Sequence, residues 1–110
     1  MFVYNITLNM DVDIELSALD WIKSEFIPRA MKEGVFHEFQ LCKLRFADQE
    51  TPAYAIQFFC SGAMDIERLL NPVHSKYLDW VADRFGLQVM SFASVLDIIE
   101  PAYLSFIHKN

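Results

Sequence analysis

Residues 2–10, FVYNITLNM, alternate between apolar and polar positions, and this alternation constrains the fold more than any other feature. Successive residues of a β-strand point to opposite faces of a sheet. The segment therefore predicts a strand with one apolar face, formed by the even-numbered residues Phe2 to Met10. Asn5, Thr7 and Asn9 lie on the opposite face, which we expect to be polar.

A helix is expected after this strand, because Leu16, Leu19, Ile22 and Phe26 recur at helical spacing. Pro28 lacks a backbone donor and disfavours helical geometry at the residue before it. The first helix is therefore predicted to end or kink near Phe26. A short second turn follows, which Gly34 can end in the left-handed conformation.

The rest of the chain completes the order βαββαβ. Strands are predicted over 35–47, 53–61 and 87–99, and a helix is predicted to begin at Ser61, to be interrupted at Asn71-Pro72 and to end at Gly86. Because neither parity of 35–47 is cleanly polar, we expect that strand to be covered on both faces. The order predicts an α+β, ferredoxin-like sandwich: a four-stranded antiparallel sheet with two helices on one face. Residues 1–99 form the domain, and 100–110 form a C-terminal tail that contacts the dimer partner.

Composition limits the partners of such a domain. Hydrophobic residues make up 54% and aromatic residues 15% of the 110 residues, more than a small monomer hides, which favours a partner or a lined cavity. The formal charge of −6 argues against nucleic acid and against an acidic membrane. The first residues lack the pattern of a signal peptide, and no apolar run approaches the ~20 residues of a membrane span. A cytoplasmic protein is expected.

The two cysteines are predicted to be free, reduced thiols. Cys42 and Cys60 are too few for a disulfide scaffold, and no spacing typical of a metal site occurs. The turn at 48–52 suggests a hairpin in which Ala47 opposes Ala53. The two thiols would then lie diagonally on one face, ~7–8 Å apart and too far for a disulfide.

No catalytic constellation and no cofactor motif can be argued from the spacing. Side chains with an apolar body and a polar tip are the ligand-pocket candidates: Tyr4, Asn5, Trp21, His37 and Trp80. The sheet face away from the helices should pack against a second copy of the chain. The dimer-interface candidates on that face are Asn5, Thr7, Gln57, Phe59, Ser91 and Ala93, together with Val95.

Four segments carry a resemblance to a known family: YNITLNMD, LDWIKSEFIPRAMKEGVF, DIERLL and RFGLQVMSFASVLDII. Over residues 2–99 the chain resembles family 4286 of the bacterial domains of unknown function. That family looks like a relative of the dimeric α/β-barrel proteins, which include cofactor-independent monooxygenases, haem-degrading enzymes and non-catalytic binding domains. The family typically has His where this chain has Phe26, and this departure weakens the case for an enzyme.

Three functional hypotheses follow. The first is a cytoplasmic homodimer that acts as a non-catalytic binding or accessory module, and the second is a cofactor-independent monooxygenase-like enzyme acting on an apolar or aromatic small molecule. In the third, the C-terminal tail docks a different protein. Convergence of Asn5, Trp21 or His37 on an open cavity would favour a ligand, whereas a space filled with side chains would favour a structural module.

Overall fold

The computed structural model describes residues 1–60 and 75–100, and its sheet confirms the expected ferredoxin-like fold. The strands are β1 (Phe2–Met10), β2 (Glu38–Lys43), β3 (Ala53–Cys60) and β4 (Val89–Asp97). They pair antiparallel in the order β2-β3-β1-β4. The predicted helix start at Ser61 and the interruption at Asn71-Pro72 lie outside the described residues.

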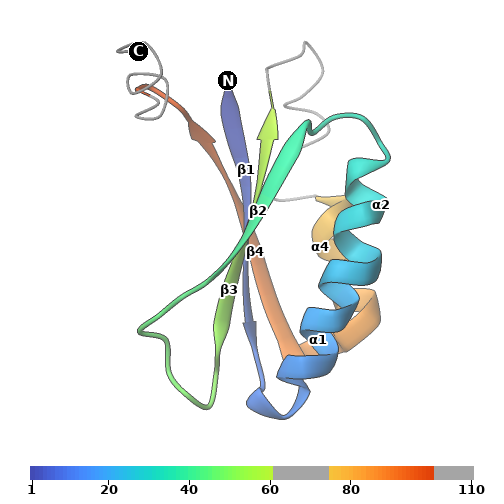
Figure 1. The fold of residues 1–110 in the computed structure, drawn as a ribbon. Helices are drawn as coiled ribbons and strands as arrows, with labels where there is room; N and C mark the ends of the chain where they lie inside the picture. Colours follow the sequence, from blue (N-terminus) through green and yellow to red (C-terminus); the bar gives the residue numbers. More distant parts are fainter. Residues whose placement is uncertain (61–74, 101–110) are drawn as a thin grey trace.

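The described helices all lie on one side of this sheet, as Figure 1 shows. A 3₁₀ turn, η1 (Val12–Ile14), leads into α1 (Glu15–Trp21), a π-helical segment η2 (Ile22–Phe26) and α2 (Ile27–Met31). The second helix of this layer is α4 (Lys76–Phe85), followed by the 3₁₀ turn η3 (Gly86–Gln88). Ser75 caps α4, accepting a hydrogen bond from the backbone N–H of Tyr77.

The first helix continues past the point where an end or kink was expected. Through η2 the helix widens, and the N–H of Ile27 donates to the carbonyl of Ile22, five residues back. A π turn accommodates a proline at the next position, because it moves the preceding carbonyls away from the ring. The expected turn at Gly34 is confirmed: its φ is +78° and its N–H donates to Met31.

The buried stripe of the first helix differs from the predicted one at its beginning. Leu16 is 84% exposed, whereas Ala18, Ile22 and Phe26 are buried. The steps from Leu16 to Leu19 and from Leu19 to Ile22 each turn the side chain by about 300°, which is about 60° less than a full turn. Leu16 therefore points about 120° away from Ile22 around the helix, and the two residues cannot share a face. The four-residue spacing from Ala18 to Ile22 to Phe26 keeps those three side chains on the sheet.

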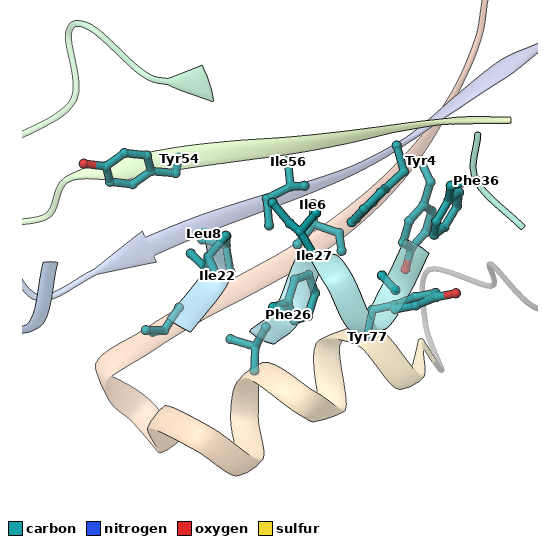
Figure 2. Close-up of a cluster of buried hydrophobic side chains, with 14 of the residues drawn as sticks. Tyr4, Ile6, Leu8, Ile22, Phe26, Ile27, Phe36, Tyr54, Ile56 and Tyr77 are labelled. Carbon is teal, nitrogen blue, oxygen red and sulfur yellow. The ribbon is translucent and has the colours of Figure 1, made fainter. Parts of the chain in front are cut away.

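The core fills the space between the helices and the sheet (Figure 2). The even-numbered residues of β1 are buried, as the alternation predicted, with Tyr4 and Ile6 fully buried. Phe26 enters from the helices against Phe58 of β3, with their ring centroids 6.5 Å apart. Burial of each such side chain stabilises the fold by about 1.5–3 kcal/mol.

The predictions for the β2–β3 hairpin were wrong in three ways. The second strand covers only Glu38–Lys43, and as an edge strand it is exposed rather than covered on both faces. In the observed register Cys42 opposes Ala55, not Phe58, because the connection spans 44–52 and not only the predicted turn. Cys42 therefore lies on the sheet face opposite to that of Cys60. Both thiols are free, as predicted.

The face assigned to three residues of β4 was also wrong. Ser91, Ala93 and Val95 oppose Leu8, Ile6 and Tyr4 of β1, and directly opposed residues share a face. The three residues therefore face the helices. Because β4 carries apolar residues at both parities, its sequence does not reveal which parity is buried. Met90, Phe92, Ser94 and Leu96 occupy the open side instead.

Candidate functional site

An aromatic cluster fills the interior where a ligand could have entered. The rings of Tyr4 and Phe36 stack with centroids 6.0 Å apart, and those of Phe36 and Phe58 stack at 4.5 Å. Tyr77 of α4 closes the cluster, 5.6 Å from both Tyr4 and Phe36. Tyr4, Phe58 and Tyr77 are fully buried. Aromatic contacts at these separations are typical of a packed core.

The polar atoms of this cluster are satisfied within the protein. The hydroxyl of Tyr4 donates to Ser75 Oγ, and that of Tyr77 donates to Glu33 Oε1 at 2.7 Å. Lys76 Nζ contacts the other oxygen of Glu33 at 2.6 Å. Burial raises the pKa of Tyr4 and of Tyr77, so both phenols stay protonated at neutral pH and act as donors. The network therefore joins β1, α4 and the segment that follows α2.

A second polar cluster lies beneath the β2–β3 hairpin. The hydroxyl of Tyr54 donates to Glu15 Oε2 at 2.5 Å, and Lys43 Nζ donates to the same oxygen at 3.0 Å. These two hydrogen bonds, with Tyr54 the larger cause, lower the pKa of Glu15. Burial raises the pKa of Tyr54, so this tyrosine is also held as a donor. These hydrogen bonds hold the start of α1 against β2 and β3.

A groove of about 520 Å³, here called the helix groove, runs between the first helix and α4. Its most specific contact is the guanidinium of Arg29, which stacks 3.8 Å from the centre of the Trp80 ring. Trp21 meets Phe85 edge-on at 5.3 Å. The lining residues are Trp21, Arg29, Lys76, Asp79, Trp80, Asp83 and Arg84.

The sheet surface away from the helices, here called the open face, differs from the rest of this acidic chain. Three of its β4 side chains are large, apolar and exposed: Met90 (61%), Phe92 (54%) and Leu96 (47%). Within the described strands, Glu38 is the one charged residue on this face. The whole sequence carries 9 basic and 15 acidic residues, so the open face is depleted in charge.

A line of polar side chains crosses the middle of the open face. Gln40 of β2 opposes Gln57 of β3, Gln57 opposes Asn5 of β1, and Asn5 opposes Ser94 of β4. We call these four residues the polar row. Gln40 Nε2 donates to Gln57 Oε1 at 2.5 Å, and Asn5 Nδ2 donates to Thr7 Oγ1 at 3.2 Å.

The five ligand-pocket candidates lie in four separate parts of the molecule. Tyr4 is in the core, Asn5 is on the open face and His37 is exposed just before β2. Trp21 and Trp80 lie together in the helix groove. Of the dimer-interface candidates, Asn5, Thr7, Gln57 and Phe59 lie on the open face, whereas Ser91 and Ala93 do not.

Two features of these sites were missed from the sequence. The stacking of Arg29 on Trp80 joins residues from separate helices, and no local pattern indicates it. The exposed residues Met90, Phe92 and Leu96 share one parity of β4, so a correct choice of parity would have found them. In the described parts of the chain, no helix is long and apolar enough to cross a membrane. Nor does any group of three or more potential ligands there form a metal site.

Comparisons with known proteins agree with this architecture. The sequence model of the family described as "Domain of unknown function (DUF4286)" matches residues 1–99. A search of curated proteins found no significant match. Two solved structures, each described as a dimeric ferredoxin-like protein from an uncultured marine organism, are similar in fold. The first has 15% identity and a TM-score of 0.55, covering 91% of this chain and 96% of its own. The second has 10% identity and a TM-score of 0.50, covering 92% and 97%.

Proposed function

The chain belongs to the DUF4286 family, and we propose that it acts as a cytoplasmic homodimer, a non-catalytic binding or accessory module whose two copies meet through their open faces. One observation carries this proposal: the open face combines exposed apolar side chains with a depletion of charge in a chain of net charge −6. Two copies of so acidic a chain repel each other, and a surface almost free of charge is where they can approach.

The similarity to solved structures described as dimeric ferredoxin-like proteins supports a homodimer. The expected dimer is two-fold symmetric, so the same patch of both copies forms the interface. A stable interface of this kind buries at least about 1,200 Å² in total. The contact expected between the C-terminal tail and the second copy falls on residues 101–110, which lie outside the described residues.

A ligand-binding role has a separate observation in its favour. The helix groove brings together Trp21 and Trp80 in an open depression of about 520 Å³. Asn5 and His37 lie elsewhere, and Tyr4 is a buried donor. The dispersal of these candidates favours the binding module over the alternative, a monooxygenase-like enzyme acting on an apolar or aromatic substrate.

Native mass spectrometry of protein purified from its own host tests both parts of the proposal. A two-subunit mass is expected. A small molecule retained by the wild type but lost on Trp80→Ala would assign the ligand to the helix groove, and Leu87→Ala, at an exposed site outside the groove, is the control. A one-subunit mass for well-folded protein would overturn the homodimer. Turnover of a retained molecule would overturn the non-catalytic assignment.

A further inference from the structure

We infer that the polar row of one copy pairs with the polar row of the second copy and thereby fixes how the two open faces align. This inference rests on the homodimer proposed above. It adds a specific role to side chains that would otherwise weaken an apolar interface.

The position of the row within the open face is the first argument. On one side of it lie Phe59, Val3 and Leu96, which oppose one another in adjacent strands. On the other side of the row, two residues away from it along each strand, lie Ala55, Thr7 and Phe92. The row is thus a polar stripe that crosses all four strands. Apolar side chains flank it on both sides, together with Glu38 on one side and Thr7 on the other. A two-fold axis that lies between the two facing sheets, and runs along the stripe or at right angles to it, places the stripe against its own copy.

The hydrogen-bonding capacity of the row is the second argument. Each amide carries an acceptor and two donors, so a row of amides can pair with an identical row. Among the described residues, Asn5 Oδ1 and Gln57 Nε2 have no hydrogen-bond partner. Water can satisfy these atoms in a monomer. Between two faces, polar groups of the second copy can take the place of this water.

The alternatives to this alignment carry an energetic penalty. If the faces shifted along the strands by one row, the amides would lie against the side chains of Phe59 or Phe92. An amide buried without a partner loses its hydrogen bonds to water and gains none in return, which weakens the dimer. A polar residue in an otherwise apolar interface selects register in the same way in coiled coils. The row therefore disfavours every alignment except the one in which row meets row.

The test replaces Gln57 by a negative or a positive residue and then mixes the two variants. Facing sheets are separated by about 10 Å, so Gln57 near the middle of the row lies close to Gln57 or Asn5 of the second copy. Gln57→Glu and Gln57→Lys should each raise the dimer dissociation constant at least about tenfold, because like charges then face each other. An equimolar mixture should recover a heterodimer with an affinity within a few-fold of the wild type. Tags of different mass identify it by native mass spectrometry.

The control pair is Gln49→Glu and Gln49→Lys, at an exposed glutamine in the 44–52 connection. Both should remain as dimeric as the wild type. If a Gln57 variant does not fold, as judged by circular dichroism, Asn5→Asp and Asn5→Lys make the same test from the neighbouring strand.

The outcomes separate this inference from the proposal beneath it. A monomeric wild type removes the homodimer and the pairing of rows together. A dimeric wild type whose charged variants remain dimers, or dissociate without recovery on mixing, leaves the homodimer in place and overturns the pairing. Recovery in the mixture supports the pairing.

Discussion

Phe58 and Phe59 are neighbours on β3, yet they belong to two different surfaces. Phe58 is fully buried against Phe26 and Phe36 on the helix-covered face. Phe59 is half-buried and points to the open face, beside Val3 of β1 and Glu38 of β2. The two faces share a backbone and differ in what covers them and in the side chains they carry.

The covered face gains its stability from within the chain. Its aromatic rings pack together, and its buried phenols are paired with Ser75 and Glu33. The open face has no such cover among the described residues, and it combines neutral polar groups with apolar ones. The difference indicates that one face is used for folding and the other for association. The predictions below test this division.

The largest expected effect comes from truncating the two neighbours in turn. Phe58→Ala should lower the free energy of unfolding by about 3–5 kcal/mol, because it leaves a cavity in a packed core. Phe59→Ala should change the free energy of unfolding of the isolated subunit by less than about 1 kcal/mol and weaken the dimer instead. Denaturant unfolding at several protein concentrations separates the two effects. Equal losses in the subunit would show that the open face is part of the core.

Phe59→Asp should have the next largest effect, and on association alone. A carboxylate buried without a partner in an interface costs about 3–5 kcal/mol, which corresponds to a dissociation constant raised at least about 100-fold. Phe46→Asp is the matched control, because Phe46 is 95% exposed in the 44–52 connection. Sedimentation velocity should show monomer for the first variant and unchanged dimer for the second. Dissociation by both variants would point to general charge repulsion.

The same division explains what the sequence could predict. The alternation from Phe2 to Met10 revealed the faces of β1, because only one parity there is apolar. Alternation did not reveal the faces of β4, because both parities carry apolar residues. Ser91 and Ala93 share a parity with Val95, and the other parity holds Phe92 and Leu96. The pairing of β4 with β1 decides which parity of β4 faces the helices. Strand pairing joins residues that are far apart in the sequence, so the local pattern does not reveal it.

The candidate site was predictable to a similar extent. Composition indicated a partner or a lined cavity, and strand parity placed Asn5, Thr7, Gln57 and Phe59 on the open face. The polar row depends on the register of three strand pairs, and the hairpin register expected from the turn at 48–52 was wrong by three residues. Contacts between helices, such as Arg29 on Trp80, have no local signal at all.

Low pH should lower the free energy of unfolding, through ion pairs on the covered side of the sheet, and should not weaken association through the open face. Partial burial opposes ionisation of Glu33, but hydrogen bonds from Lys76 and Tyr77 outweigh it and lower the pKa of Glu33. The pKa of Glu15 is lowered by Tyr54 and Lys43. A carboxyl with a lowered folded-state pKa stabilises the fold above its unfolded-state pKa of about 4.5, and this contribution disappears as the pH falls through the folded-state pKa.

The free energy of unfolding should therefore fall between about pH 5 and pH 3, and Glu33→Gln should reduce that dependence. The dissociation constant of the dimer should not rise over the first part of this range, where the subunit stays folded, since the polar row does not titrate. Parallel measurements of unfolding and sedimentation check this contrast. Loss of the dimer before any loss of subunit stability would contradict it.

The smallest perturbation compares the two thiols. Cys60 is buried on the covered face, and burial raises its pKa to about 11, whereas Cys42 is exposed on β2. In the subunit dissociated by dilution, where the open face that carries Cys42 is uncovered, a thiol reagent at pH 8 should modify Cys42 at least about tenfold faster than Cys60, whose modification needs opening of the structure. Peptide mass mapping over time identifies each site, and Cys42→Ser should remove the fast phase. Equal rates would contradict the register that separates the two thiols.

Sedimentation equilibrium of the wild-type protein at micromolar concentration tests the central claim most directly. The account predicts a mass of two subunits, about twice 12.8 kDa, that dissociates reversibly on dilution. A single-subunit mass across that range, in protein that remains folded with Phe58 buried, would contradict the assignment of the open face to a second copy of this chain.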